Sequence, residues 1–456
     1  ARLLGTADGR LRFLRELGRF VHHHYQPILA CFPSASSNPL EVLVDPESLW
    51  DERSAFALAE GMMPGCEELV KISDGLHAEL ERRLLRRLEG DREQDERRMH
   101  RCDAPPNLYF HQAEEVYKAY KQELVRLARA TGVPLDDPLQ SLAQIHTDLT
   151  KRNIWSPFDG PAAAAVQMTE GLLGHIIAGA DVPLTNLASI QENVDLLNAL
   201  LPLQQTMREL AGGSSGAEVY GSELLMHLTA SLMQRALPGA EDLPVPLMSA
   251  DKLMALHLTH SSNMEFLRQL LQVEWKSSLG WPRNYVGPGD MIVFELYGPS
   301  VHTTQDRRLN DTTGWYVRIL KVSLSLDQQR AGGVKEWDAI ADPPEMVPVE
   351  IPWCGTDGSP AIFCPVSRFL AYANERVKKA CVIDSELRHL HERHWSMLTY
   401  AASLSSRGIA SLSDDPQQYA RRTDAPSYWN REEMDGDIAM TRRMKGQGES
   451  LTSDSE

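Results

Sequence analysis

The segment AQIHTDLTKRNIW, residues 143–155, has the residue types and spacing of a phosphotransferase catalytic loop. In that chemistry an aspartate orients the nucleophilic hydroxyl group, and an asparagine holds a metal ion beside the phosphates. His146, Asp148 and Asn153 stand in the matching order H-x-D-x-x-x-x-N. They form one candidate catalytic set, that of a divergent phosphotransferase.

The surrounding sequence lacks the other parts of a phosphotransferase. A second metal-binding aspartate must follow on nearby strands, and a lysine must reach the phosphates from an upstream sheet. Here Asp159 comes too soon, and the first 145 residues are predicted to be helical, with no glycine-rich hairpin. We therefore favour a helix end capped near Thr147 or Asp148 over a catalytic loop, and we assign no catalytic residue.

Two histidine clusters are candidates for zinc binding. His391 and His394 stand at i and i+3 in HLHERHW, with His389 beside them and Cys381 upstream. No glutamate precedes a histidine in the metallopeptidase order, and cationic side chains near a helix C-terminus explain the cluster as well. In VHHHY, residues 21–25, three adjacent histidines cannot converge from one helix, so we expect them to face solvent. We predict no metal site and no cofactor.

The glycine-rich segment ELAGGSSGAEVYGSE, residues 209–223, is a candidate phosphate cradle. A cradle needs a strand before it and a helix N-terminus after it. The preceding residues are predicted to form a helix, and no Lys-Ser or Lys-Thr pair ends the segment. We therefore predict a flexible connection between two helices.

The elements that would position these residues are mainly helices in the first 275 residues. In residues 66–102, apolar side chains recur every three or four positions between charged ones, which predicts an amphipathic helix. Further helices are predicted at residues 111–132, 162–179, 186–211, 219–236 and 250–273.

Strands are predicted beyond residue 275. GDMIVFELYG and GWYVRILKVSLSL are rich in β-branched and aromatic residues, and MVPVEIPW and AIFCPV form a second candidate pair joined by CGTDGSP. Aromatic residues gather around these strands, where packing against a helix layer is favoured over base stacking. They are Trp275, Trp281, Tyr285, Trp315 and Tyr316.

This pattern predicts an α+β fold, predominantly helical and multi-layer, with an inserted β-rich section near residues 276–366. The predicted divisions are helical subdomains at 1–160 and 161–275, the β-rich section, returning helices at 367–425 and a polar, extended tail at 426–456.

Composition limits the classes of protein. The 46 basic and 63 acidic residues give a net charge of −17, which disfavours coating of single-stranded nucleic acid by charge neutralisation. No apolar run approaches the roughly 18–20 residues that cross a bilayer, and the start lacks a signal-peptide pattern. The cysteines show no repeated spacing and no C-x-x-C, so we expect mostly reduced thiols in an intracellular protein. They are Cys31, Cys66, Cys102, Cys354, Cys364 and Cys381.

Three functional classes remain. We predict a structural or assembly protein, namely a subunit of a virus or virus-like shell. Such a subunit self-associates into a large oligomer, in the cytoplasm or in the virion, and has no membrane partner. The acidic charge favours a shell that encloses double-stranded RNA without strong charge-based binding. The alternatives are an adaptor-type binding module and an enzyme whose active site forms only on folding, including a phosphotransferase using His146, Asp148 and Asn153. The lack of a readable catalytic motif weighs against an enzyme.

Overall fold

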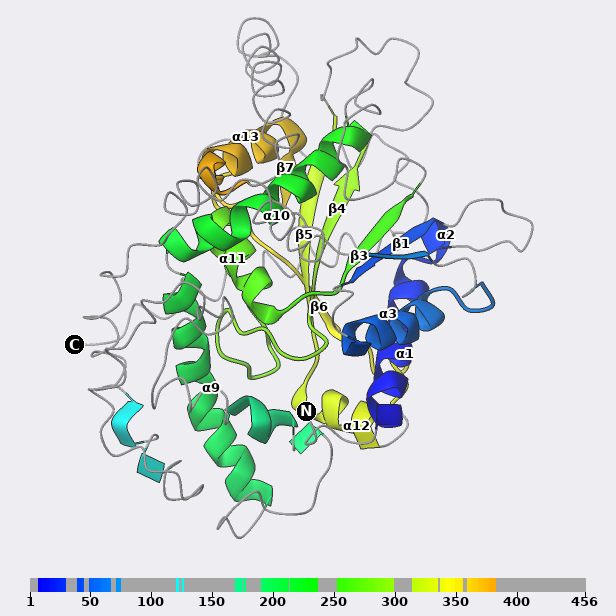
Figure 1. Cartoon of the computed structure of the whole chain (residues 1–456), viewed down its shortest axis with the longest axis vertical. Coiled ribbons are helices and arrows are strands. Elements are labelled where there is room, and N and C mark those ends of the chain that lie inside the picture. The colour runs from blue at the N-terminus through cyan, green and yellow to red at the C-terminus, as the bar shows by residue number, and fades with distance from the viewer. Residues whose placement is uncertain are drawn as a thin grey trace, which may run out of the picture.

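The computed structural model contains helices and sheets, which confirms the α+β class (Figure 1). It describes residues 7–29, 39–44, 49–66, 71–74, 120–122, 125–126, 169–174, 176–177, 190–212, 214–236, 252–298, 314–334, 337–355 and 359–382. The predicted tail and nearly all of the predicted returning helices after residue 382 lie outside these ranges, and the predicted domain boundaries stay predictions.

The helices of the described residues include several that the apolar periodicity predicts. Their bounds are α1 Ala7–His24, α2 Gln26–Leu29, α3 Leu49–Met62, α9 Ile190–Gly212, α10 Ser214–Ala236, α11 Ser261–Leu271, α12 Leu326–Val334, α13 Val366–Arg376 and the short 3-10 helix η6 Lys379–Cys381. Within the described part of the chain, no helix combines the length and apolar character that crossing a membrane requires.

A parallel sheet forms from three short strands in the region predicted to be helical. β1 (Leu40–Val44) lies between β2 (Lys71–Asp74) and β3 (Met254–His257), and both neighbours run parallel to it. The predicted helices over 66–102 and 250–273 are therefore wrong at β2 and β3. Parallel strands are often buried on both faces and show no alternation, so a strand of four residues is easily read as part of a helix.

An antiparallel sheet confirms the strands predicted beyond residue 275. β5 (Tyr316–Ser323) pairs along its length with β4 (Met291–Tyr297). It also pairs with β6 (Glu345–Pro348) and β7 (Phe363–Pro365). β6 and β7 thus pair with β5 and not with each other, apart from one bridge between Ile351 and Ala361 that follows β6.

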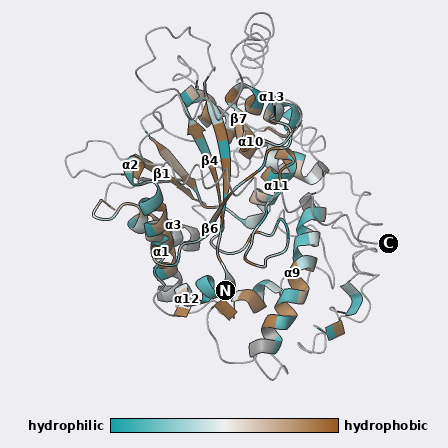
Figure 2. Ribbon diagram, turned by 180° about the vertical axis from the view of Figure 1, so that it is seen from behind, coloured by the Kyte–Doolittle hydropathy of each residue, from teal (hydrophilic) through white to brown (hydrophobic). Residues whose placement is uncertain are grey.

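Within the described part of the chain, two hydrophobic cores hold these elements together. The first core joins α10, α11 and α13 to one face of the antiparallel sheet, and the predicted packing role of Trp275 is confirmed because it is buried there. The second core joins α1, α3 and β1 to the C-terminal end of β5 and to Trp337. Figure 2 shows the hydrophobic residues along these helices and strands.

Two glycines let α1 and α3 cross in backbone contact. A Cβ atom at Gly18 would lie 2.2 Å from the carbonyl oxygen of Leu58, and one at Gly61 would lie 2.0 Å from that of Arg15. No side chain fits at such distances, so this crossing depends on both glycines. The contact seats α1 in the second core, where Leu17 and Met62 are buried.

A disulfide bond corrects the prediction of reduced thiols. Cys354 and Cys364 are bonded to each other across ten residues of sequence, and Cys66 is also disulfide-bonded. The expectation failed because it relied on cysteine density, which is low in a chain of 456 residues. The Cys354–Cys364 bond lies in the first core and ties the residues after β6 to β7.

One buried ion pair lies between α1 and the antiparallel sheet. Nε of Arg318 on β5 lies 2.6 Å from Oε2 of Glu295 on β4, with side chains 7% and 10% exposed. The hydroxyl groups of Tyr25 and Tyr297 donate to the same carboxylate at 2.7 Å and 2.8 Å. The guanidinium also lies over the rings of Tyr297 and Phe363. One carboxylate thus joins three segments of the chain.

A second buried ion pair fixes the loop before β4. The ammonium group of Lys321 contacts the Asp290 carboxylate, and the two side chains are 2% and 1% exposed. Asp290 also accepts hydrogen bonds from the backbone N–H groups of Gly287 at 2.8 Å and Leu324 at 3.3 Å. Burial raises the pKa of Asp290 although Lys321 opposes the shift, and burial lowers the pKa of Lys321 although Asp290 opposes it.

Candidate active site

The carboxyl ends of the parallel strands form one edge of the sheet. In open parallel sheets this edge is where ligands bind. In the chain, β1 is followed by α3, and β3 is followed directly by α11. Leu43 on β1 lies opposite His257 on β3. The N-termini of two helices therefore follow the same edge of the sheet.

The start of α11 presents polar groups at this edge. His260 is the N-cap residue, and its carbonyl oxygen accepts the Asn263 backbone N–H at 3.0 Å. The Asn263 amide group donates to the Thr259 hydroxyl. Thr259 and His260 are exposed. The first backbone N–H groups of a helix attract anions, so this end of α11 can bind an anionic group beside an imidazole.

Arg53 adds a cation on the neighbouring helix. It lies one turn into α3, the helix that follows β1, and its side chain is exposed. Arginine binds phosphate and carboxylate groups through paired N–H donors. The same edge of the sheet thus carries an arginine, a histidine and two helix N-termini, a combination suited to an anionic substrate.

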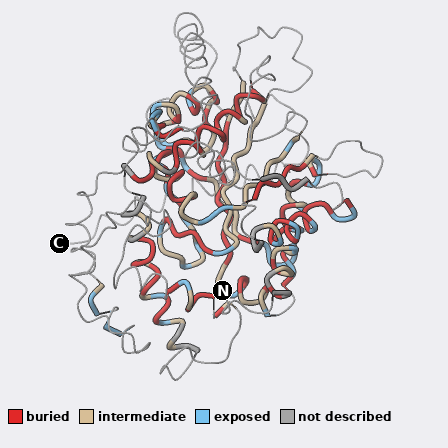
Figure 3. The backbone as a smooth tube through the Cα atoms, in the orientation of Figure 1, coloured by how far each residue is buried: buried red, intermediate tan, exposed pale blue. Residues whose placement is uncertain are grey.

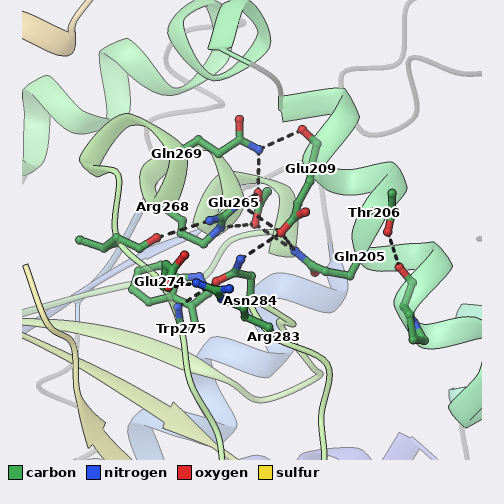
Figure 4. A network of polar contacts seen from close by, with 12 residues as sticks. Gln205, Thr206, Glu209, Glu265, Arg268, Gln269, Glu274, Trp275, Arg283 and Asn284 are labelled. Carbon is green, nitrogen blue, oxygen red and sulfur yellow. Dashed lines mark hydrogen bonds and ion pairs between the residues drawn. The ribbon is translucent and has the colours of Figure 1, made fainter. Parts of the chain in front are cut away.

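A network of polar contacts holds α11 in place (Figure 4). Arg268 on α11 donates to Glu265 at 2.6 Å and 2.9 Å and to Glu209 on α9 at 3.3 Å. Asn284 donates to Glu209 at 3.0 Å and accepts the Trp275 backbone N–H at 3.0 Å. Burial alone would lower the pKa of Arg268, but the two glutamates outweigh it, so the pKa lies above its ordinary value. The network fixes α11 to α9 and to the following loop, and so positions His260.

His257, the last residue of β3, is held neutral. It is half-buried, and loss of solvation lowers its pKa to about 4. Met254 and Leu256 pack against the second core, so His257 lies on the opposite face of the sheet. An uncharged imidazole at this position avoids the cost of burying a cation behind the candidate site.

We expect His257 to make the protein less stable in acid. The unfolded chain binds a proton near pH 6.5 and the folded chain only near pH 4, so stability is complete above pH 6.5 and falls as the pH drops toward 4. The loss at pH 4 is roughly 2–3 kcal/mol. Urea unfolding of the wild-type protein and His257→Gln at pH 7 and pH 4 measures it. Parallel pH profiles for the two proteins would contradict the assignment.

Most of the site residues predicted from the sequence lie outside the part of the chain that the structure describes. His146, Asp148 and Asn153 lie outside the described residues, so the phosphotransferase loop stays a prediction. The cluster of His389, His391 and His394 also lies outside the described residues. Cys381, which precedes it, is buried.

The three adjacent histidines of α1 differ from the expectation of solvent exposure. The expectation is wrong for His22, whose Nδ1 lies 2.8 Å from the Met62 carbonyl oxygen, and for His24, whose ring packs against Phe20 and Tyr25. His23 is exposed. Successive side chains on a helix point about 100° apart, so the three rings reach three different environments.

The glycine-rich segment at 209–223 is almost entirely helical. α9 continues to Gly212 and α10 begins at Ser214, so the predicted flexible connection is much shorter than the glycines suggest. A helix, not a strand, precedes it, and it lacks the geometry of a phosphate cradle. Among the residues that the structure describes, no group of three histidine, cysteine or acidic side chains is arranged to hold a metal ion.

No protein-family description matches the sequence. No curated protein sequence matches it either. Solved structures do match the fold. The apo form of the Hafnia alvei phytase has a TM-score of 0.55 and 18% identity over 84% of this chain and 89% of that one. Its complex with myo-inositol hexakis sulphate has a TM-score of 0.55 and 16% identity over 82% and 88%. The Klebsiella sp. ASR1 phytase has a TM-score of 0.52 and 19% identity over 83% and 86%.

The chain has the fold of these phytases. The prediction of a virus or virus-like shell subunit enclosing double-stranded RNA is therefore wrong, and the terms capsid and virion do not apply. The prediction of a shell relied on layered helices, a β section and the lack of local motifs. An enzyme fold whose functional residues come from distant segments has the same features.

The sequence does not point directly to the residues at the carboxyl edge of the sheet, because β3 lies inside a segment that is predicted to be a helix. The sequence LMALHLTHSSN, residues 253–263, contains a usable signal. A short apolar run is followed by Thr259 and His260, and serines then begin an amphipathic segment, which is typical of a strand leading into a helix.

Proposed function

We propose that this protein is a phosphatase that hydrolyses phosphate monoesters at the carboxyl edge of the parallel sheet. The observation that carries the proposal is the fold shared with phytases over most of the chain, with His260 and the start of α11 at that edge. Phytases are phosphatases, and the phosphoryl group is an anion of the kind that a helix N-terminus attracts.

The proposed site acts by holding the phosphoryl group. In the proposed site, the backbone N–H groups of Ser261 and Ser262 at the start of α11 bind phosphoryl oxygens, and the His260 imidazole donates a further hydrogen bond. Arg53 contributes positive charge from α3. Charge on the equatorial oxygens must be stabilised when the P–O bond breaks and water adds, and fixed donors supply this without reorganisation.

Removing the imidazole tests the site. We expect His260→Ala to lower kcat/KM for p-nitrophenyl phosphate by about 100-fold or more, the usual effect of losing one transition-state donor. The matched control is His23→Ala, which removes an exposed histidine from α1 and should leave the rate unchanged.

The outcomes separate the site from the activity. Wild-type protein that releases no p-nitrophenol would contradict the phosphatase proposal itself. Wild-type activity retained in His260→Ala would place the reaction elsewhere in the chain. Circular dichroism of both variants establishes that they fold.

We also propose an oxidising compartment for this activity. Cys66, Cys354 and Cys364 are disulfide-bonded, and structural disulfides are typical of such compartments. The multi-layer arrangement of the helices and the self-association of the chain are likewise proposals, and size-exclusion chromatography with light scattering tests the latter.

A further inference from the structure

The C-terminal end of α11 is closed by a glutamine in an unusual backbone conformation. Gln272, the C-cap residue, has φ 51° and ψ 40°, which lie in the left-handed region. Its backbone N–H donates to the Gln269 carbonyl oxygen at 3.2 Å, and that of Val273 donates to the Arg268 carbonyl oxygen at 3.1 Å. Helices commonly end with glycine in this conformation, because a residue with a Cβ atom is strained there. A glutamine at this position therefore indicates a role for its side chain.

The Gln272 side chain accepts two hydrogen bonds from α13. Its Oε1 accepts the Tyr372 hydroxyl group at 2.6 Å and the Arg376 guanidinium group at 3.0 Å. The preceding carbonyl oxygen, that of Leu271, accepts Nε1 of Trp353 at 2.7 Å. These three donors form one stack, because the Trp353 and Tyr372 rings lie 3.7 Å apart and Arg376 lies over the Tyr372 ring at 4.9 Å. We call Trp353, Tyr372 and Arg376 the C-terminal clasp of α11.

A close contact with α10 lies between the clasp and the start of α11. A Cβ atom at Gly221 of α10 would lie 2.8 Å from Cδ1 of Leu270 and 2.9 Å from Cβ of Phe266. The last eight residues of α11 include all of its buried positions, whereas residues 261–263 at its start are half-buried (Figure 3). A helix of 11 residues is roughly 16 Å long. The clasp and the candidate site thus lie at opposite ends of one helix, with the α10 contact between them.

We propose that Gln272 is a positioning residue, which acts through α11 on the placement of His260 and of the first backbone N–H groups. This inference rests on the proposed function. A hydrogen-bonded helix moves as one body, so releasing its C-terminal end from the clasp lets it tilt about the contact at Gly221. Such a tilt displaces the N-terminal end in the opposite direction. A displacement of about 1 Å in the groups that hold a transition state costs up to about 100-fold in rate.

Gln272→Gly separates a positioning role from a purely structural one. Glycine adopts φ 51° without strain, so the midpoint of thermal unfolding should change little although two hydrogen bonds are lost. We expect kcat for p-nitrophenyl phosphate to fall by about 10- to 100-fold with little change in KM, since the displaced donors lose contact mainly with the transition state. Gln272→Glu keeps an oxygen acceptor for Tyr372 and Arg376 and should retain most of the wild-type activity. The matched control is Lys379→Met, which changes an exposed residue just beyond α13 and should leave the rate unchanged.

A second measurement follows the position of His260 without relying on activity. NMR of the full chain with labelled histidines gives one imidazole signal for His260, which is assigned by its loss in His260→Ala. We expect this signal to shift in Gln272→Gly and to return to its wild-type position in Gln272→Glu. In Lys379→Met it should stay in place.

The two measurements separate this inference from the phosphatase proposal. Wild-type protein that releases no p-nitrophenol would overturn the phosphatase proposal, and the His260 signal would then still test whether Gln272 positions that residue. An unchanged His260 signal in Gln272→Gly would overturn the positioning role, whatever the rate. A loss of activity that is matched by a lower unfolding midpoint would show a structural role instead. Equal losses in Gln272→Gly and Gln272→Glu would show that the oxygen acceptor is not what the site depends on.

Discussion

Glu295→Gln is expected to lower the free energy of unfolding by about 3–5 kcal/mol, the usual cost of breaking a buried ion pair by removing one partner. The change preserves size and removes only charge. Arg318, 7% exposed, would then be a buried cation without its carboxylate, and the Tyr25 and Tyr297 hydroxyl groups would lose a charged acceptor. Urea unfolding at neutral pH measures the difference.

The pKa shifts in this cluster have the same cause. Burial, followed by the charge of Glu295, raises the pKa of Tyr25 and of Tyr297. Burial alone would lower the pKa of Arg318, but Glu295 outweighs it and the pKa is raised. The carboxylate is thus the group on which the other charges depend.

Two controls make the Glu295 result specific. Glu60→Gln removes the partner of Arg15 in a surface ion pair with both side chains more than 40% exposed, and should cost less than about 1 kcal/mol. The double variant Glu295→Gln/Arg318→Met removes both charges and should recover much of the loss. A double variant no more stable than Glu295→Gln would contradict the ion-pair explanation.

Asp290→Asn is expected to cost a similar amount, about 3–5 kcal/mol, because it leaves the ammonium group of Lys321 in the interior. The side chain of Lys321 is 2% exposed, and its other acceptors are the Ser323 hydroxyl at 3.0 Å and the Val322 carbonyl oxygen at 3.4 Å. These neutral groups replace a carboxylate poorly. Thermal or urea unfolding measures the effect.

The reverse change should be milder. Lys321→Met leaves Asp290 with the backbone N–H donors of Gly287 and Leu324, whereas Lys321 without Asp290 keeps only a hydroxyl group and a carbonyl oxygen as acceptors. Lys276→Met, which removes a partner of Glu350 on the surface, is the control and should change stability by about 1 kcal/mol or less. Equal losses for Asp290→Asn and Lys276→Met would show that water reaches Lys321.

The elements that the sequence predicts well are those with a clear period or composition. β4 and β5 are long and β-branched, and α9 and α10 have sustained helical periodicity. β1, β2 and β3 have four or five residues each, and β1 is buried throughout. Without alternation, such strands are recognised only through their partners, which lie far away in the sequence. Without β1, β2 and β3, the sequence does not reveal the carboxyl edge of the parallel sheet, where His260 lies.

The candidate site was harder to predict for a related reason. The loop at 143–155 resembles phosphate chemistry through local spacing alone. The proposed site instead combines Arg53 and His260, which follow different strands and share no local motif. A local motif can only indicate chemistry that is confined to one loop. In this sheet the carboxyl ends of the parallel strands lie at the same edge, so polar groups from segments about 200 residues apart lie at that edge.

The second core has a consequence for synthesis on the ribosome. Its helices α1 and α3 come from the first 62 residues, but they share this core with residues from Val322 onward. Tyr25 and its acceptor Glu295 are 270 residues apart. At about 5–20 residues per second, the apolar sides of α1 and α3 wait roughly 15–50 s for their partners to emerge. Nascent chains of this protein should therefore engage chaperones early and release them only after β5 has left the exit tunnel.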